Sequence, residues 1–512
     1  MLLLSSSVHS KWAAQPERRE AIKAAFLHNY GIYEKYAFGY DIVRPITRKG
    51  SDNTILAGMG GTIIDSMSTM IIMGLNDTQE YHRALEHVRK TDFTMTRTGN
   101  PVGTVSLFEL TIRYIGGLIS AFELNGEQKQ ERFLIDQAAS LANELTHAWS
   151  WNTRIPYNRV NINKKHPEEE EELKDRGTAC LAEIGTLTME WDRLSHYTGN
   201  STYKKLALDS LEAVFDSTAI FPGLWAQRMD RRTEKPHRDY VTWGGGTDSM
   251  IEYFSKYPLM LGDSQHKQLS ILNETMSSTF DQLVKKTGLG NLTFLADWSK
   301  YYGHGTINIH SHLACFSGGN IAMAGKILHK DDWTQLGLEL SESCARMYEM
   351  TYTGIGPIAW GWLDKEGRAL GWEDSTDITS ARMEFHQNNG VFLTMEFYSH
   401  QPEVIESMFY AWRTTGDEMW RDMAWNAFQS MQKYLEFNQS GWTGITNVND
   451  PSAGLYDMMQ SFLFAELFKY LFLMFDDPDR FSLDDYVFNT EAHPFKRKSN
   501  SNFGKIQDGI IS

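Results

Sequence analysis

Short motifs with acidic or polar side chains recur along this chain, and the segments between them carry helix patterns. Neighbouring motif positions lie about 60 to 90 residues apart, which is the length that two helices and their loops need. One motif in each helical hairpin would place all the motif side chains at one end of a ring of paired helices. The spacing predicts such a ring without fixing its number of hairpins. The motif positions are Glu109, Glu183, Asp248, His312, Glu403 and Gln460.

Amphipathic helix patterns dominate the chain, and alternating strand patterns are scarce. Over residues 104–124, apolar side chains recur at three- and four-residue steps, as on one face of a helix. Glu109 and Arg113 lie one helical turn apart beside this apolar face, where they can pair. The chain is therefore predicted to be all-α. Further helices are expected at 181–194, 408–414, 423–434 and 460–475.

We expect one domain over residues 19–495, because no stretch is long enough to act as a linker between two domains. Residues 1–18 are expected to be a flexible segment or the remnant of a leader. The first five residues are too short for the apolar core of a signal peptide. Residues 496–512, rich in Lys, Ser and Asn, are expected to form a flexible tail. No membrane-spanning segment is expected.

The net charge of −16 argues against nucleic acid or an anionic membrane as a partner. The acidic composition suits a protein that binds a cation or neutral sugars. The protein is expected to be a monomer. Aromatic residues make up 12% of the chain, enough to pack a core and to stack on sugar rings. Glycosylation sequons favour the secretory pathway or secretion. They begin at Asn76, Asn200, Asn273, Asn291 and Asn438.

Four acidic motifs stand out from the helix patterns. They cover residues 106–118 around Glu109, 244–253 around Asp248, 402–407 around Glu403 and 488–494 around Thr490. Each residue also has an ordinary interpretation when taken alone. The pair Glu109–Arg113 could be a surface ion pair, Asp248 could cap a helix, and Thr490 could be a turn residue.

Taken together, these motifs resemble the class I α-1,2-mannosidases of glycoside hydrolase family 47, over nearly the whole chain. The resemblance implies an (α/α)7 barrel, an inverting hydrolytic mechanism and a bound calcium ion. Glycoside hydrolysis needs one carboxylic acid to protonate the leaving oxygen and a second carboxylate to activate water. By resemblance, Glu109 is the general acid and Arg113 lies beside it. Asp248 and Glu403 are both candidates for the base, and Glu403 is preferred.

The resemblance also assigns residues that bind the substrate. His312 and Glu183 match a histidine and a glutamate that contact sugar, and Glu491 lies at the sugar-binding end of the site. Gly246 matches a position that is arginine in endoplasmic-reticulum members, which remove one mannose selectively. Golgi and fungal members have a small or apolar residue there and trim more broadly. Gly246 therefore predicts the Golgi and fungal subgroup.

A calcium ion is the expected cofactor, and Ca²⁺ takes six to eight oxygen ligands. By resemblance, the hydroxyl and carbonyl oxygens of Thr490 bind the ion directly. Adjacent sugar hydroxyls are expected to complete its shell. The carboxylates expected to hold it through water are Glu252, Glu406, Glu466 and Glu491.

Besides Ile42, which replaces an acidic residue after Asp41, three positions depart from the family pattern. Gln401 replaces an arginine, Gln460 replaces a glutamate that binds sugar, and Ser68 replaces an aspartate. The first two changes remove one positive and one negative charge from the floor of the expected cavity. We hypothesise that they compensate for each other.

The three cysteines exclude a small disulfide scaffold. By resemblance, Cys315 and Cys344 form a disulfide, which leaves Cys180 free.

The expected function is removal of terminal α-1,2-linked mannose from high-mannose N-glycans or related mannans. Two alternatives stay open. One is a mannose-binding quality-control protein with little or no activity, and the other is a mannosidase with a different linkage or mannan specificity.

Overall fold

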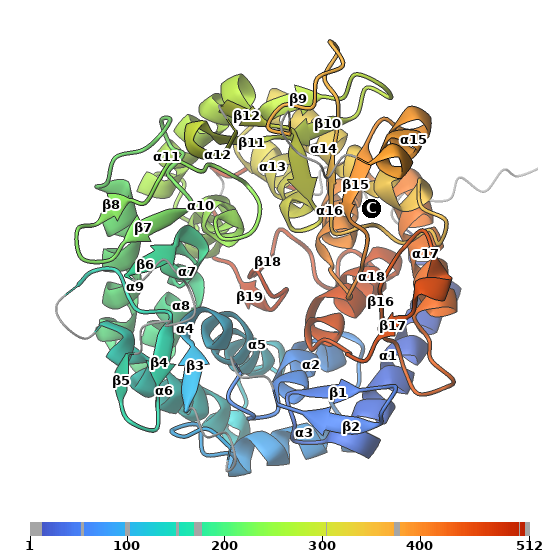
Figure 1. The fold of residues 1–512 in the computed structure, drawn as a ribbon. Helices are drawn as coiled ribbons and strands as arrows, with labels where there is room; N and C mark the ends of the chain where they lie inside the picture. The colour runs from blue at the N-terminus through green and yellow to red at the C-terminus, as the bar shows by residue number, and fades with distance from the viewer. Residues whose placement is uncertain are drawn as a thin grey trace, which may run out of the picture.

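The computed structural model describes residues 13–52, 56–97, 103–149, 153–167, 177–303, 305–372, 379–500 and 502–506. Residues 1–12 of the expected leader segment and 507–512 of the expected tail lie outside this description. Figure 1 looks along the axis of a ring in which an inner layer of helices is surrounded by an outer layer.

The inner layer is a closed ring of seven helical units among the described residues. Each inner helix packs against the next along the chain, and the last packs against the first. Such closure leaves a central space that side chains from every inner helix can reach. The inner helices are α2 (Gly61–Ile72), α5 (Gly116–Leu124), α8 (Thr188–Thr198), α10 (Asp248–Leu261), α13 (Phe316–Ile327), α16 (Glu403–Thr415) and α18 (Phe468–Phe475).

In the part of the chain that the structure describes, seven outer helices cover the inner ring, each packed on an inner partner. The first outer helix packs on α18, so the two ends of the chain join to close the barrel. The predicted (α/α)7 barrel is thus confirmed. The outer helices are α1 (Pro16–Ala37), α3 (Gln79–Lys90), α6 (Phe133–Leu145), α9 (Ser201–Phe215), α11 (Lys267–Ser278), α14 (Asp331–Glu349) and α17 (Glu418–Tyr434).

Short helical turns extend or connect these helices. The α-helical ones are α4 (Leu107–Glu109), α7 (Leu181–Gly185), α12 (Lys300–Gly303) and α15 (Ser380–Asn389). The π-helical turns are η1 (Leu110–Ile115), η4 (Thr279–Leu283) and η7 (Leu463–Leu467). The 3-10 turns are η2 (Lys129–Glu131), η3 (Thr146–Trp149), η5 (Leu313–Cys315) and η6 (Pro451–Ala453).

The strands are two to four residues long and pair antiparallel in small sheets within the connections. Two of them run directly into the short turns α4 and α7, which precede inner helices, so they fix where those turns begin. The first ten are β1 (Ile42–Arg44), β2 (Lys49–Ser51), β3 (Thr104–Ser106), β4 (Arg159–Asn161), β5 (His166–Pro167), β6 (Thr178–Cys180), β7 (Arg228–Asp230), β8 (Lys235–Pro236), β9 (Val284–Lys286) and β10 (Thr293–Leu295). The others are β11 (Asp297–Ser299), β12 (Gly305–Ile307), β13 (Ile309–Ser311), β14 (Ala359–Gly361), β15 (Phe392–Met395), β16 (Gly444–Ile445), β17 (Leu455–Tyr456), β18 (Tyr486–Phe488) and β19 (Pro494–Lys496).

Inner helices are more completely buried than outer helices, and their sequences differ accordingly. Every residue of α2 is buried, because α2 is surrounded by protein on all sides. The outer helix α3 buries only Tyr81, Ala84 and Val88, which share one face of the helix. The helix expected over 104–124 begins at Leu107 instead, because residues 104–106 pair with β4 as strand β3.

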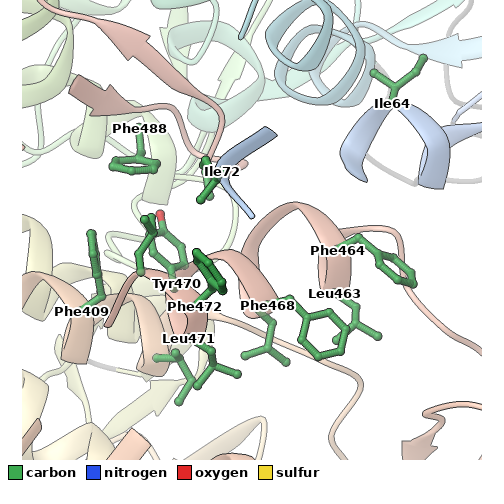
Figure 2. Close-up of a cluster of buried hydrophobic side chains, with 14 of the residues drawn as sticks. Ile64, Ile72, Phe409, Leu463, Phe464, Phe468, Tyr470, Leu471, Phe472 and Phe488 are labelled. Carbon is green, nitrogen blue, oxygen red and sulfur yellow. The ribbon is translucent and has the colours of Figure 1, made fainter. Parts of the chain in front are cut away.

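A C-terminal hairpin lies in the centre of the ring (Figure 1). Strands β18 and β19 pair in the register Phe488 with Pro494, and they contact the inner helices α10 and α5. The ring of Phe488 packs against Phe409 and Tyr470, at 5.9 and 6.0 Å between ring centroids. Figure 2 shows these three rings in the apolar cluster beside α18. The hairpin is thereby anchored in the core.

The ordered domain extends slightly beyond the expected boundaries. Helix α1 begins at Pro16, inside the segment 1–18 that was expected to be flexible. In the expected tail 496–512, Phe503 and Ile506 are buried in the core. Apolar side chains in an otherwise polar tail account for this difference. Within the described residues, no helix combines the length and the apolar character needed to cross a bilayer.

Cys315 and Cys344 form a disulfide, as predicted, and Cys180 is free. The disulfide joins the start of the inner helix α13 to the outer helix α14, across 29 residues. A loop of this length is expected to contribute about 3 to 4 kcal/mol to stability by restricting the unfolded chain.

Replacing both cysteines with alanine should therefore lower the free energy of unfolding by about 3 kcal/mol. Urea denaturation without reductant measures this change. Cys180→Ala is the matched control and should change stability by less than about 1 kcal/mol. An unchanged double variant would show that the crosslink contributes nothing to stability.

Candidate active site

A cavity of about 570 Å³ lies at the end of the barrel where the inner helices begin. Most of the predicted site residues line it, although their motifs are far apart in the sequence. Predicted residues on its wall are Glu109, Arg113, Glu183, Gly246, Asp248, Glu252, Gln401, Glu403, Glu406, Glu466, Thr490 and Glu491. His312 and Gln460 are not among the lining residues.

Glu109 is held at the cavity wall by both its backbone and its side chain. Ser106, at the end of β3, caps α4 by accepting the backbone N–H of Glu109 at 3.2 Å. Arg113 Nε donates to Glu109 Oε2 at 2.8 Å, so the predicted pair forms. Arg113 lies within the π-helical turn η1, and π turns occur frequently at functional sites.

Arg113 connects Glu109 to the hairpin tip. Its guanidinium also donates to Glu491 and lies 3.6 Å from Asp65 Oδ2. Burial alone would disfavour the charge, but the carboxylates of Glu491, Glu109 and Asp65 raise the pKa of Arg113 well above its ordinary value. The arginine therefore remains a fixed positive charge between three acidic groups.

Asp248 is the first residue of α10. Its Oδ1 accepts the backbone N–H of Ser249 at 2.9 Å. Burial, together with the negative charges of Glu252 and Glu403, raises the pKa of Asp248 to about 7. Asp248 therefore gains a proton far more readily than an ordinary aspartate.

Glu403 begins α16, where the helix N-terminus favours a negative charge. Its Oε2 lies 2.9 Å from Nδ1 of His312, and Nε2 of His312 lies 3.0 Å from the hydroxyl of Tyr348. With Glu403 ionised, Nδ1 carries the proton and the Tyr348 hydroxyl donates to Nε2. His312 is fully buried. The structure thus places it behind Glu403, where it orients that carboxylate.

Glu183 lies on the wall beside the turn that carries Glu109. It accepts hydrogen bonds from Asn158 Nδ2 at 2.7 Å and from the backbone N–H of Cys180 at 3.1 Å. Oδ1 of Asn158 accepts from the Ser106 hydroxyl and from the N–H of Phe108, both at 3.0 Å. Asn158 thereby connects the segment that carries Glu109 to Glu183 through hydrogen bonds.

Gly246 has a φ of +87°, a conformation that side chains other than glycine adopt rarely. A Cβ atom there would lie 3.1 Å from Nε2 of Gln227. The backbone of this chain therefore favours glycine at this position. Gly246 lines the cavity.

Thr490 lies at the tip of the central hairpin, which several inner helices hold in place. Its backbone N–H lies 3.3 Å from the hydroxyl of Tyr253 on α10. Asn489 donates to the carbonyl of Ile112 at 3.0 Å and to Glu190 at 2.7 Å. Lys469 of α18 donates to the carbonyl of Ala492 at 2.5 Å. These bonds fix the position of the threonine before any ligand binds.

The carboxylates around Thr490 carry more negative charge than their partners neutralise. Burial and mutual repulsion raise the pKa of Glu466 well above its ordinary value, and that of Glu406 to about 8. Buried Lys256 offsets part of this charge, because it pairs with Glu252 and lies 3.6 Å from Glu406 Oε1. A divalent cation bound nearby would relieve the remaining repulsion.

The oxygen atoms at this end of the cavity fit a hard cation such as Ca²⁺. Among the described residues, the cluster of His, Cys, Asp and Glu ligand atoms tight enough to hold one ion directly is His310, Cys315 and Cys344. Two of these form the disulfide. Within the described part of the chain, no three carboxylates converge in the same way.

The three departures from the family pattern have different surroundings. Gln401 lines the cavity, and its Oε1 accepts the N–H of Ser399 at 2.7 Å. Gln460 donates instead to the sulfur of Met458 at 3.0 Å. The two glutamines thus have separate partners, and compensation between them stays a hypothesis. The Ser68 hydroxyl lies 2.9 Å from Nδ1 of His493, below the hairpin tip.

Several residues that support the site lie outside the positions predicted from the motifs. Lys256 and Lys469 follow Glu252 and Glu466 by four and three residues, so helix spacing could have revealed both lysines. Asn158 gave no signal, because it comes from a connection that only the folded chain brings to Glu109 and Glu183.

The arrangement as a whole can carry out acid–base chemistry on a neutral, hydroxyl-rich ligand. Glu109, Asp248 and Glu403 share one cavity, and each starts from the first turn of a helical unit. Phe108, Phe316 and Phe462 add aromatic surface to the wall. Rings can pack against the apolar face of a sugar while carboxylates bind its hydroxyl groups.

Comparisons with known proteins agree with this site. The sequence model described as glycosyl hydrolase family 47 matches residues 25–497. A mannosyl-oligosaccharide alpha-1,2-mannosidase from Coccidioides posadasii is 36% identical, over 96% of this chain and 93% of its own length. Mannosyl-oligosaccharide alpha-1,2-mannosidase 1B from Aspergillus phoenicis is 34% identical, over 96% of this chain and 94% of its own length.

Among solved structures, the alpha-1,2-mannosidase from Trichoderma reesei superposes with a TM-score of 0.87. It is 31% identical to this chain, and the match covers 95% of this chain and 100% of that one. Sequence and fold thus agree over nearly the whole length. The chain belongs to glycosyl hydrolase family 47.

Proposed function

We propose that this glycoside hydrolase is a calcium-dependent, inverting exo-α-1,2-mannosidase that trims high-mannose N-glycans. The observation that carries the proposal is the shared cavity. Glu109, paired with Arg113, lies in the same cavity as Asp248 and Glu403, and Thr490 rises into it on the central hairpin. The α-1,2-mannosidase relatives from two fungi support the bond that is cleaved.

In the proposed reaction, Glu109 gives a proton to the glycosidic oxygen as the bond to the anomeric carbon breaks. Glu403 removes a proton from a water molecule, whose oxygen attacks the opposite face of the anomeric carbon. His312 orients Glu403 for this step. Asp248 lines the same cavity and is the alternative base, or a group that positions the water.

Thr490 would hold the cation directly, and Glu252, Glu406, Glu466 and Glu491 would hold it through water. When bound, the ion supplies ligand positions for two adjacent sugar hydroxyls and so orients the ring. Arg113 keeps Glu491 and Glu109 in fixed positions relative to each other. The protein is proposed to work as a monomer in the lumen of the secretory pathway or after secretion.

A second candidate is a mannose-binding protein with little activity. Gln401 favours it, because an amide stands in the cavity wall where the family has a charged guanidinium. Release of mannose from an α-1,2-linked disaccharide separates the two proposals. Binding without release would support the second candidate, and a panel of other linkages would detect a changed specificity.

Glu109→Gln should lower the turnover number at least about a hundredfold, because an amide cannot protonate the leaving oxygen. Initial rates on the α-1,2-linked disaccharide give this number. Glu86→Gln is a matched control, since Glu86 pairs with Lys90 one turn further on an outer helix. Turnover of Glu109→Gln close to that of the parent would exclude Glu109 as the acid.

Removal of divalent cations with EDTA should abolish both sugar binding and mannose release, and added Ca²⁺ should restore them. Thr490→Val should weaken Ca²⁺ binding, because the hydroxyl ligand is lost while the side chain keeps its size. Calorimetric titration with Ca²⁺ measures this effect without any substrate. An enzyme that keeps full activity after EDTA would remove Thr490 from the mechanism.

Asp248→Asn should stabilise the cation-free protein, and increasingly so as the pH rises from about 4 to 7. The folded pKa of Asp248 lies above its ordinary value of 3.8, so the folded state holds the extra proton in this window. The buried charge therefore costs most stability above pH 7, on the order of a few kcal/mol. Melting temperatures between pH 4 and 8 test this, with the exposed Asp136→Asn as control. If the melting temperatures of the parent and of Asp248→Asn changed in parallel between pH 4 and 8, this prediction would be contradicted.

A further inference from the structure

Two adjacent tyrosines project from the surface in the connection before α13. Tyr301 is 65% exposed and Tyr302 is 53% exposed, and their ring centroids are 4.8 Å apart. The two rings stand at 80° to each other, and the guanidinium of Arg238 lies 4.7 and 5.3 Å from their centroids. We call these three residues the tyrosine platform. Exposed aromatic clusters of this kind mark binding surfaces more often than single exposed apolar residues do.

The turn that carries the platform is held rigidly. The Asp239 carboxylate accepts from the Ser299 hydroxyl at 2.7 Å and from the backbone N–H groups of Lys300 and Tyr301 at 3.1 and 3.3 Å. Arg238 has a φ of +63°, which is uncommon for a residue with a side chain. A strained backbone conformation beside an exposed aromatic pair is consistent with a binding role for the Arg238 side chain.

The platform is joined to the rim of the cavity by a short hydrogen-bonded segment. Trp298 of β11 exchanges two backbone hydrogen bonds with Val241, at 2.8 and 2.9 Å. From Val241 the chain runs directly to Gly245 and Gly246 on the cavity wall. Chain geometry limits the separation of the platform and the rim to at most about 30 Å. Figure 1 shows α12 and the β11–β12 hairpin on the periphery beside α10.

The size of the platform distinguishes between possible ligands. Two tyrosines can bury at most about 300 to 500 Å². A stable protein interface needs roughly 800 Å² on each partner, so the platform is too small to hold a protein by itself. A pyranose ring has an apolar face whose C–H groups are attracted to an aromatic ring. Arg238 adds hydrogen-bond donors for hydroxyl groups at the edge of the same surface.

We propose that the tyrosine platform is an outer binding site for a remote mannose of the oligosaccharide whose terminal mannose lies in the cavity. This inference rests on the proposed function, because it assumes an oligosaccharide substrate. A branched oligosaccharide reaches beyond the cavity, whereas a disaccharide does not. The platform therefore selects long substrates and leaves the chemistry unchanged.

The test compares Tyr301→Ala/Tyr302→Ala with the parent on two substrates, an α-1,2-linked mannose disaccharide and a free high-mannose oligosaccharide. We expect kcat/KM for the oligosaccharide to fall about tenfold, equal to about 1.4 kcal/mol, chiefly through a higher KM. The value for the disaccharide should stay within about twofold. Tyr352→Ala, at an exposed tyrosine (71%) in another loop, is the control and should change neither value. Tyr301→Phe/Tyr302→Phe keeps the rings and should retain most of the oligosaccharide activity.

An unchanged oligosaccharide KM would overturn the platform proposal, and so would an equal loss on both substrates. A loss seen only with a glycoprotein, and not with the free oligosaccharide, would assign the surface to polypeptide and also overturn it. No mannose release by the parent from either substrate would refute the proposed function alone. Calorimetric binding of the oligosaccharide to parent and variant, with Ca²⁺ present, would then still decide the platform proposal.

Discussion

The negative charge gathered on the axis of the barrel is the constraint around which the rest of the structure is arranged. Carboxylates from several inner helices and from the hairpin meet there, away from bulk water. Buried charges of one sign repel each other, so each needs a partner. Arg113 and Lys256 supply positive charge from within the helices. A closed ring of rigid helices holds these groups together although their repulsion would separate them in a flexible loop.

Much of this arrangement could be predicted from the sequence, because it depends on short motifs and helix spacing. The pair Glu109–Arg113 follows from a separation of four residues, and Cys315–Cys344 follows from the resemblance. The resemblance also located Asp248, Glu403 and Thr490, which now line one cavity. The sequence pattern alone would have left all three with ordinary structural roles.

What the sequence could not reveal depends on contacts between distant segments. His312 was expected to touch the sugar, but its place behind Glu403 depends on how α13 and α16 pack. Asn158 joins Glu183 to the Glu109 segment from a connection with no motif of its own. Gln460 turns toward Met458 and away from the cavity. Side-chain direction of this kind is decided by local packing, which no spacing rule describes.

The central hairpin has a consequence for how the enzyme is made. Arg113 pairs with Glu491 across 378 residues, so the site depends on a contact between distant parts of the chain. Contacts of such long range form late in folding. The chain is synthesised from its N-terminus, and the last helix of the ring, α18, ends at Phe475, shortly before the hairpin begins at Tyr486. A chain that ends before the hairpin would have the helices of its barrel but not the tip that carries Thr490 and Glu491. Cleavage activity would thus begin only when the last part of the domain has been made and docked.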